Sequence, residues 1–518
     1  MNDPTIASSK RPPDLGDAAR ATADADLVDA APAAALPTAD AAELPLPRVG
    51  AGLDATRAAD AAELPLPLVG ADLVVPLVTG ERVRYVNLDC AASAPCLRAV
   101  HEAVTALLPW YSSVHRGAGF ASAVMTDAYD EARAIVAELV GARPDDAVVF
   151  TRNTTDSLNL LAAALPDDTT VVSFASEHHA NLLPWRRGDS VLLPIPASPE
   201  EALARVDAAL GAATARHRLL AVTGASNVTG ELWPLADLAA LAHHHGARIA
   251  IDAAQLAPHR AIDIAALDAD YLALSAHKLY APFGAGVLVG RSDWLDAAEP
   301  YLAGGGAVRR VTLERTEWAR GPARHEAGTP NVLGAIALAA ACRTLGGVGM
   351  DAVAAHEARL LGRATTGLAR VPGLEILSMW GPASPRVGIV AFTVDGWHPS
   401  ALAAALSAEH GIGVRDGAFC AHPFVASLVG AGADGKSPGA VRASFGVGTS
   451  TDDIDRLLGA VEELVARGPR WSYRFAGGRW QPHPDPRERP RLPGGRDPVA
   501  FGREHTPRAD AEPCRADA

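Results

Sequence analysis

The sequence predicts an α/β fold built around a mostly parallel β-sheet, and two patterns support this prediction. The first is a series of short apolar runs with the length and composition of buried strands. The second is the placement of helical segments, such as residues 157–165 and 234–245, between several of these runs. Strands that alternate with helices at this spacing form parallel sheets. The strand-like runs are residues 147–150, 170–174, 219–223, 248–252, 271–275 and 286–290.

Beyond about residue 345 the pattern changes. Helical periodicity over residues 351–370, 399–410 and 451–467 surrounds two strand-like segments, residues 388–396 and 411–416. Such a mixture indicates a smaller α+β domain. We therefore predict a large domain over residues 81–345, including an N-terminal arm, and a small C-terminal domain over residues 346–467.

The two ends of the chain differ from this middle part in composition. Residues 1–80 are rich in Ala, Asp and Pro, and DAAELPLPRVGAGL at 40–53 recurs as DAAELPLPLVGADL at 60–73. Because this composition buries too little apolar surface to offset the entropy of ordering, we expect a disordered leader. A docking role for the ELPLP motifs is the alternative. Residues 468–518 are rich in Pro and Arg, and we expect a disordered tail with a short docked stretch near WSYRFAGGRW.

Composition also excludes several classes of protein. The 518-residue chain has a formal net charge of −14, which disfavours binding to nucleic acid. It has no apolar run of about 18 residues, and its acidic start lacks the features of a secretory signal. Five cysteines are spread over the chain without a CxxC pair, which argues against a disulfide framework and a structural zinc site. These observations predict a cytoplasmic protein that binds neither nucleic acid nor membrane.

Lysine is nearly absent from this chain, which uses arginine for almost every positive charge. Of the 46 basic residues, only Lys10, Lys278 and Lys436 are lysines. Lys278 follows the strand-like run at 271–275, in a loop that Gly and Pro bound. A primary amine at such a place can form a Schiff base with an aldehyde cofactor, a task that a guanidinium cannot perform. A solvent-exposed surface lysine is the alternative.

Polar residues follow other predicted strands. Asp252 and Gln255 lie at the end of the run at 248–252, and the carboxyl ends of strands in α/β sheets gather active-site groups. An aspartate there can hold a pyridinium nitrogen protonated, or it can simply cap a helix. Thr154 and Thr155 stand where a strand turns into a helix, a place that favours a phosphate or ordinary capping. His178, in SEHHANLLPW, can stack on a flat heterocycle.

Eight motifs in this order resemble the class V aminotransferase family of fold-type I pyridoxal-phosphate enzymes. They are FTRNTTDSLNL, EHHANLLPW, SNVTGELWPL, IDAAQLAPH, SAHKLYAPFGAGVL, EAGTPN, RDGAFCAHP and VRASFG, and the resemblance covers residues 84–466. Within the family the chain is most similar to SufS-type cysteine desulfurases and selenocysteine lyases. The resemblance implies pyridoxal 5'-phosphate as cofactor, a seven-stranded large domain, a smaller C-terminal domain and a homodimer.

The resemblance also implies a role for individual residues. Lys278 forms the Schiff base and moves protons, Asp252 pairs with the pyridine nitrogen, and Gln255 bonds the phenolic oxygen. His178 stacks on the ring. The phosphate is held by Thr154, Thr155, Ser275 and His277, with Thr329 reaching it from a partner subunit. The substrate carboxylate is held by Asn227 and Arg442, Arg415 lines the same pocket, and His115 and Arg116 close the site of the neighbouring subunit.

Cys420 stands where these desulfurases carry their nucleophilic cysteine. The expected reaction converts L-cysteine to L-alanine and leaves a persulfide on Cys420, from which a sulfur-acceptor protein takes the sulfur. However, the loop departs from the family's GHHC pattern, because Ala418 and Phe419 replace the two histidines. Cys90 also stands where the family usually has Asn or Ser, and we expect a small packed residue. The alternative is therefore a class V lyase, epimerase or aminotransferase that acts on another amino acid without a persulfide.

Overall fold

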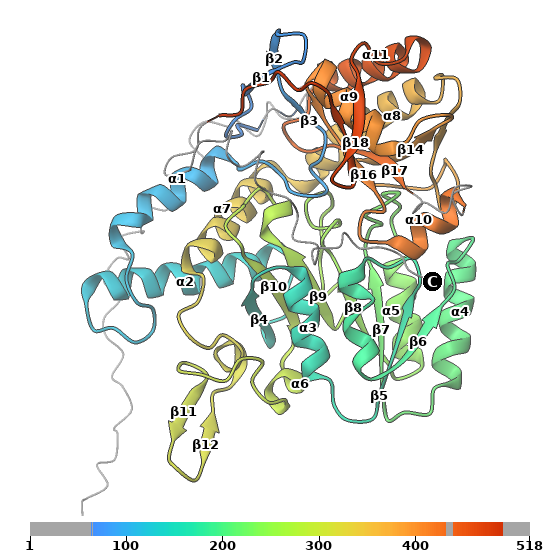
Figure 1. The fold of residues 1–518 in the computed structure, drawn as a ribbon. Coiled ribbons are helices and arrows are strands. Elements are labelled where there is room, and N and C mark those ends of the chain that lie inside the picture. Colours follow the sequence, from blue (N-terminus) through green and yellow to red (C-terminus); the bar gives the residue numbers. More distant parts are fainter. Residues whose placement is uncertain (1–63, 65, 431–438, 491–518) are drawn as a thin grey trace, which may run out of the picture. The chain divides into compact units, whose positions relative to one another are not determined.

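Seven strands form the central sheet in the order β4-β10-β9-β8-β7-β5-β6 (Figure 1). The computed structural model describes residues 64, 66–430 and 439–490. Neighbouring strands from β6 to β9 pair in parallel, whereas β10 is antiparallel to both of its neighbours. The strands are β4 (Asp146–Thr151), β5 (Thr169–Phe174), β6 (Asp189–Leu193), β7 (His217–Thr223), β8 (Arg248–Asp252), β9 (Tyr271–Ser275) and β10 (Gly286–Arg291).

Helices cover both faces of this sheet because successive strand residues point to opposite sides. Leu272 and Leu274 of β9 belong to the core on one face, whereas Tyr271 and Ala273 belong to the core on the other. The first core is completed by α1 (Arg98–Leu107), α2 (Phe120–Leu139), α4 (Pro199–Ala212), α5 (Leu235–His244) and α7 (Val332–Val348). The second is completed by α3 (Thr154–Ala164), the 3₁₀ turn η4 (Pro184–Arg187) and α6 (Ser292–Ala297).

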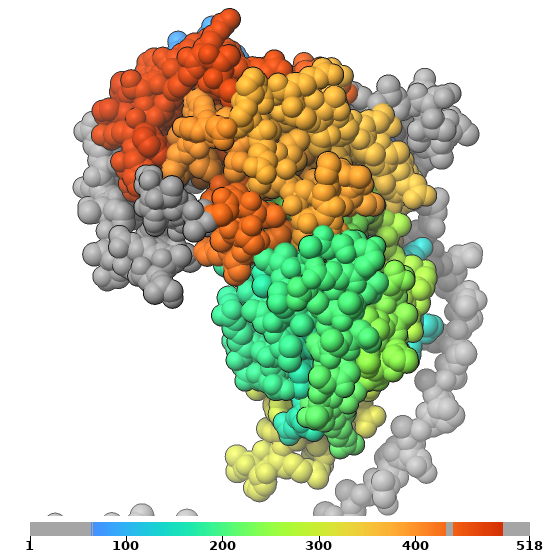
Figure 2. Space-filling view, turned by 90° about the vertical axis from the view of Figure 1, so that its right-hand side faces the viewer, coloured from blue at the N-terminus to red at the C-terminus, as the bar shows by residue number. Residues whose placement is uncertain are grey.

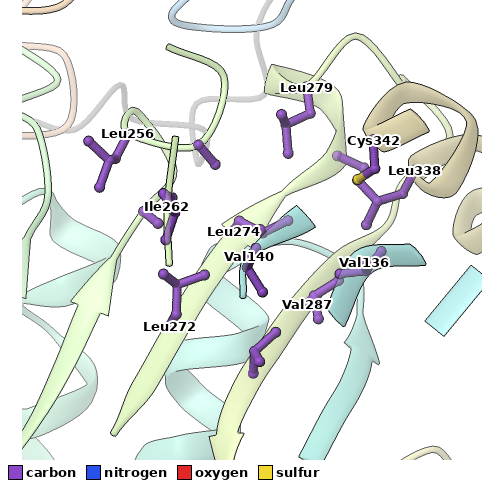
Figure 3. Packing of buried hydrophobic residues seen from close by; sticks show 14 of the residues in the cluster. Val136, Val140, Leu256, Ile262, Leu272, Leu274, Leu279, Val287, Leu338 and Cys342 are labelled. Atoms are coloured by element: carbon purple, nitrogen blue, oxygen red, sulfur yellow. The ribbon is translucent and has the colours of Figure 1, made fainter. Parts of the chain in front are cut away.

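Figure 3 shows part of the first core, where three layers meet. Val136 of α2 and Leu338 of α7 point toward Leu274 and Val287 of the sheet, and Cys342 packs beside them as a small hydrophobe. Between them these side chains leave almost no exposed surface. This apolar packing fixes the strand ends that carry the polar residues of the site.

A second, antiparallel sheet lies in the C-terminal part, in the order β13-β14-β17-β16. Its helices α8, α9 and α11 share one apolar core with β14 and β17. Figure 2 shows this orange and red part seated directly on the green part of the central layer. The elements are α8 (Met350–Leu368), β13 (Leu374–Ile376), β14 (Ile389–Val394), α9 (Pro399–His410), β16 (Arg415–Gly417), α10 (His422–Val429), β17 (Ala440–Ser444) and α11 (Thr451–Arg467).

The predicted α/β class and the strand-like runs are confirmed. All six runs form strands of the central sheet, and β6 is the seventh, which the sequence reasoning missed because its residues are mostly exposed. The segment predicted as one strand at 411–416 is two strands, β15 (Ile412–Gly413), which pairs with β3 (Val86–Asn87), and β16. The described residues fall within one compact unit, so the boundaries near residues 345 and 467 stay a prediction.

The expectation of a disordered leader over residues 1–80 is wrong for its last part. Residues 66–80 are described, and β1 (Val74–Pro76) pairs with β2 (Arg82–Arg84). Leu66 and Leu68, from the second copy of the repeat at residues 60–73, are buried in the first core. The amide of Val69 donates to Cys96 O at 2.8 Å. The apolar Leu side chains between the prolines were the signal for this docking, and the first copy lies outside the described residues.

The short docked stretch that the sequence predicts near WSYRFAGGRW, at the start of the tail, is confirmed. WSYRFAGGRW, residues 471–480, covers most of the hairpin of β18 (Tyr473–Ala476) and β19 (Arg479–Pro482), which packs on α9. The buried carboxylate of Glu409 accepts hydrogen bonds from the amide of Arg470 and the hydroxyl of Tyr473, both at 2.8 Å. These two contacts hold the start of the tail. Residues 491–518 lie outside the described residues.

None of the described helices is by itself long and apolar enough to cross a membrane. The helices α7 and α8 meet both conditions only when they are taken together, and the chain bends by 79° between them.

Candidate active site

A cavity of about 280 Å³ opens at the edge of the central sheet where β7, β8 and β9 end. This is the carboxyl edge, where open α/β sheets bind their ligands. Polar residues predicted from the sequence converge on it from the central sheet and from the C-terminal sheet. The predicted residues that line the cavity are Thr154, Thr155, His178, Asn227, Asp252, Gln255, Ser275, His277, Lys278, Arg415, Cys420 and Arg442.

Lys278 lies in a 3₁₀ turn, η5 (Ala276–Lys278), that follows β9 directly. Burial lowers the pKa of its amine to about 8, although the nearby carboxylate of Asp252 opposes this shift; the Arg442 guanidinium adds to it. Within the described part of the chain the amine has no hydrogen-bond or ion-pair partner. It is therefore an available nucleophile near neutral pH, as Schiff-base chemistry requires.

Asp252 ends β8, and its Oδ1 accepts a hydrogen bond from the amide of Ala254 at 2.9 Å. Burial raises the pKa of this carboxyl, while the Lys278 ammonium opposes the rise. Gln255, on the following turn, donates through Nε2 to Ala91 O at 2.8 Å. Its Oε1 is buried and has no hydrogen-bond partner among the described residues. Asp252 and Gln255 thus both have polar atoms free to bind a ligand in the cavity.

His178 is held as a neutral ring. Its Nδ1 accepts a hydrogen bond from the amide of Ala180 at 3.0 Å, so the ring proton belongs on Nε2. Burial lowers the pKa of His178 to about 3, and the positive charge of Lys278 adds to the effect. A neutral, flat imidazole at the wall of the cavity suits stacking on an aromatic heterocycle.

The start of α3 forms a polar cradle on another side of the cavity. The amide and the hydroxyl of Thr154 contact Ser275 Oγ at 2.8 and 2.7 Å, which joins the helix to the end of β9. Asn153 caps the helix by accepting from the amide of Asp156. Together with Thr155 and His277, these groups offer hydroxyls, a ring N–H and the positive end of a helix dipole, a combination that favours a phosphate.

Arg442, in the middle of β17, is buried and brings a guanidinium into the cavity. Its Nη1 donates to Asn227 O at 2.8 Å, its Nη2 donates to Asp89 Oδ1 at 3.2 Å, and the Phe419 ring lies 5.0 Å from its guanidinium carbon. Nε has no partner among the described residues. Asn227, predicted to hold the substrate, also has a second task, because its Nδ2 donates to Phe419 O at 2.7 Å.

Cys420 lies on a tight loop between β16 and α10, and it is exposed. Phe419 and Cys420 both have left-handed backbone conformations, with φ of 51° and 55°. Two consecutive non-glycine residues in this region store strain of about 1–3 kcal/mol each, a feature that clusters at functional sites. The bond from Asn227 to Phe419 O fixes the loop so that Cys420 faces the same cavity as Lys278.

Three predicted site residues lie elsewhere on the chain. His115, which has a positive φ of 62°, contacts Asp130 at 3.0 Å. Arg116 donates through Nη2 to Gly305 O at 2.9 Å and to Gly328 O at 3.1 Å, next to the exposed Thr329. The structure thus brings Arg116 and the Thr329 loop together, but away from the cavity that holds Lys278.

Sequence reasoning missed several groups that shape the site. Asp89 pairs with Arg442, and Glu177 bonds the amide of Thr223 and the side chain of Asn181 beneath the His178 turn. Burial raises the pKa of Glu177 to about 8. Each is an acidic residue that follows an apolar run, and this pattern could have been found in the sequence. The hydrogen-bond partners of the two carboxylates are known only from the tertiary structure.

Comparisons with known proteins agree with this geometry. The family model described as aminotransferase class-V matches residues 86–457. Cysteine desulfurases from Dickeya dadantii and Klebsiella pneumoniae are 38% and 37% identical to this chain, each over 75% of it and 93% and 94% of their own lengths.

Among solved structures, cysteine desulfurases from Thermococcus onnurineus and Escherichia coli, the latter in an S-sulfonic acid form, superpose with TM-scores of 0.67 and 0.64. Both are 35% identical and cover 74% of this chain, which itself covers 95% of theirs. The resemblance found in the motifs is thereby confirmed, and the chain belongs to the class V aminotransferase family.

Proposed function

We propose that this protein is a pyridoxal-phosphate-dependent cysteine desulfurase that converts L-cysteine to L-alanine and receives the sulfur on Cys420. The observation that supports this proposal most directly is the position of Cys420, whose thiol lines the same cavity as the buried Lys278 amine and the Arg442 guanidinium. The names of the similar proteins support the same activity.

The residues of the cavity fit pyridoxal phosphate. The Thr154–Ser275 cradle would hold the phosphate, Asp252 would accept the ring N–H, and His178 would stack on the ring. The second Nε2 proton of Gln255 is available to donate to the phenolic oxygen. The buried Oε1 of the same side chain accepts no hydrogen bond from the described residues, as expected of a group that faces a bound ligand. When bound, this cofactor supplies an aldehyde for the Lys278 amine and a ring that accepts the electron pair released at the substrate α-carbon.

The protein's own groups then divide the work. Arg442 binds the substrate carboxylate through its unpartnered Nε and the adjacent Nη, because a guanidinium pairs with a carboxylate through two parallel hydrogen bonds. Lys278 Nζ, with its lowered pKa, takes and returns the proton at the substrate α-carbon. The thiolate of Cys420 Sγ, carried on the strained loop, would attack the substrate sulfur. The new S–S bond would form as the substrate Cβ–S bond breaks; the electron pair of that bond would stay on the substrate carbon, whose protonation gives alanine, and Cys420 would keep the sulfur as a persulfide.

One observation favours the alternative reaction. Ala418 and Phe419 replace the two histidines of the family's loop, and the Phe419 ring lies against Arg442 instead. An apolar group at this place suits a substrate without a transferable sulfur. The second candidate is therefore a class V lyase, epimerase or aminotransferase in which no persulfide forms on Cys420.

The decisive experiment compares the wild type with Cys420→Ala, both loaded with pyridoxal phosphate and given L-cysteine. In the wild type, mass spectrometry should find one extra sulfur on Cys420, and alanine and sulfide should form in the presence of a reductant. Cys420→Ala should still bind cysteine, because Arg442 and Lys278 are intact, but should release no sulfide. Cys96→Ala, a change at a partly buried cysteine outside the cavity, is the matched control. Full activity of Cys420→Ala on the true substrate would replace the persulfide mechanism by the alternative.

The proposal includes a homodimer, a thiol-bearing sulfur acceptor and a cytoplasmic location. Support for the dimer is the Arg116–Thr329 cluster, which lies away from its own cavity and includes an exposed hydroxyl. Mixing Arg116→Ala chains with Lys278→Ala chains tests it, since one intact site would form in each mixed dimer. Activity that appears only on mixing supports the shared site, and inactive mixtures contradict it. The location remains a prediction from the cysteine pattern and composition.

A further inference from the structure

Cys420 faces a second cavity as well as the one that holds Lys278. This outer cavity has a volume of about 260 Å³, and it is lined by His179, Leu183, Arg187 and Cys420 among others. Leu183 and Arg187 are exposed, so the outer cavity lies at the protein surface. A substrate bound over Lys278 blocks one side of the cysteine. The outer cavity is the side from which a second thiol can reach it.

The ring of His179 lines this outer cavity together with Cys420, and His422 contacts that ring. The amide of His179 donates to Cys420 O at 2.8 Å, which fixes the two residues next to each other. The ring of His422 meets the ring of His179 edge to face, with 4.7 Å between their centroids. His422 comes two residues after the cysteine, on the side opposite to the missing loop histidines.

The tautomer of His179 follows from its neighbours. The amide N–H of His422 points at His179 Nε2 from 3.5 Å, so the proton of the neutral ring belongs on Nδ1. Burial lowers the pKa of His179, and the nearby His422 and Arg186 lower it further, which keeps the ring neutral at pH 7. Within the described part of the chain Nδ1 has no partner. It is a hydrogen-bond donor on a ring that lines the same outer cavity as the exposed Cys420 thiol.

We propose that His179 Nδ1–H donates to the sulfur of Cys420 and stabilises its thiolate form, and that His422 is the residue that positions the His179 ring for this task. The inference rests on the proposed function for its role in turnover. In this chain the pair takes over the work of the two absent loop histidines, from the opposite side of the cysteine.

The chemical step at which this donor acts is sulfur release. The thiolate of an acceptor attacks the outer sulfur of the persulfide, and a new S–S bond forms while the bond to Cys420 Sγ breaks. The electron pair of the broken bond stays on Cys420 Sγ, which leaves as a thiolate. His179 Nδ1–H stabilises this leaving group, and the sulfane sulfur moves between two thiols without any further oxidant or reductant.

Other charged groups also face Cys420 and must be separated from His179 in a test. Lys278 and Arg442 interact with the thiol from the inner side, and Arg415 lines the same inner cavity. On the outer side, His178, His179 and Arg187 share its cavity, and Arg186 and His422 interact electrostatically with His179. Variants of the outer pair leave all the inner cations in place.

The experiment measures the rate at which iodoacetamide alkylates Cys420 between pH 5 and pH 10. It uses the full chain loaded with pyridoxal phosphate, without substrate, and follows the Cys420 peptide by mass spectrometry. Losing a hydrogen bond to a charged group should slow alkylation at pH 7 by about tenfold in His179→Ala and move the profile to higher pH. His179→Asn, whose amide N–H can replace Nδ1–H, should restore most of the rate. His422→Ala should show a smaller shift in the same direction.

His101→Ala, a change at an exposed histidine on α1, is the matched control and should match the wild type. If His179→Ala behaves like this control, the proposal is overturned. If His179→Asn is as slow as His179→Ala, the hydrogen-bond donor role is overturned and His179 is structural. Because no substrate is present, a wild type that forms no persulfide contradicts the proposed function while leaving this result standing.

Discussion

Burial sets the protonation state of the groups around Lys278. It lowers the pKa of the amine to about 8 and holds His178 neutral. In the cofactor-free protein the neutral, nucleophilic fraction of Lys278 should therefore rise from about one tenth at pH 7 to about nine tenths at pH 9. The rate of pyridoxal phosphate uptake, followed as the growth of its yellow absorption band, should rise about tenfold over this range. Lys278→Ala should never develop that band, and a flat pH profile in the wild type would contradict the assignment.

Asp252 acts at the same scale through its charge. Asp252→Asn keeps the hydrogen bond from Ala254 but can no longer balance a protonated pyridine nitrogen. We expect it to fold normally and to slow exchange of the substrate α-proton by about 10²–10³-fold, in line with other losses of electrostatic stabilisation. Proton exchange into deuterated water measures this step. A variant that exchanges at the wild-type rate would show that Asp252 is only a cap.

At the scale of elements, the docked end of the leader is part of the folded core. Leu66 and Leu68 are only 7% and 8% exposed. Replacing either by Ala should lower the free energy of unfolding by about 2–3 kcal/mol, the lower part of the range for buried leucines, because the surface segment can collapse. Urea unfolding measures the change. Leu73→Ala, at a side chain that is 51% exposed, is the control and should cost well under 1 kcal/mol.

Truncations divide the leader in the same way. Removal of residues 1–63 leaves both leucines in place, whereas removal of residues 1–73 uncovers their sites on the core. Only the longer truncation should lower the melting temperature. Equal stability of the two truncated proteins would mean that residues 64–73 do not stabilise the folded core.

At the scale of the whole molecule, buried ion pairs join the C-terminal part to the central layer. Glu357 of α8 is buried against His259 and Arg260, which follow β8, and Arg260 also donates to Arg386 O at 2.8 Å. Burial alone would raise the pKa of Glu357, but the charges of His259 and Arg260 outweigh it and lower the pKa below its ordinary value of 4.5. Glu357 therefore stabilises the fold above about pH 4.5, and this contribution is lost as the pH falls through its lower folded pKa.

Glu357→Gln tests this coupling. It should lower the free energy of unfolding by about 3–5 kcal/mol at pH 7, because it leaves the partly buried Arg260 guanidinium without its counter-charge. It should also flatten the loss of stability below pH 4.5. Asp455→Asn, which breaks an exposed pair with Arg363, should cost less than about 1 kcal/mol. If Glu357→Gln loses stability below pH 4.5 as steeply as the wild type, the acid-induced loss of stability is caused by the protonation of another carboxylate.

The α/β class and the six sheet strands could be predicted from the sequence, because each depends on local information. Local patterns also indicated Lys278, Asp252 and His178, whereas only the resemblance to the class V family implied that Asn227, Arg415, Cys420 and Arg442 belong to the same cavity. Buried strands need apolar runs, and a sheet places the residues that follow its parallel strands on one edge, so Asp252 and Lys278 had to converge. The scarcity of lysine singled out one amine. These relations hold between neighbours in sequence or between consecutive strands.

Only the tertiary structure decided which partners those residues have. Asp89 meets Arg442 across 353 positions of sequence, and Asn227 holds the loop of Cys420 across 192. His179 lies against Cys420 because two left-handed residues turn the loop back onto the sheet edge, a conformation that no local pattern specifies. The burial of Leu66 also depends on the tertiary structure. An apolar side chain between prolines is ordered only when a core formed elsewhere in the chain can bury it.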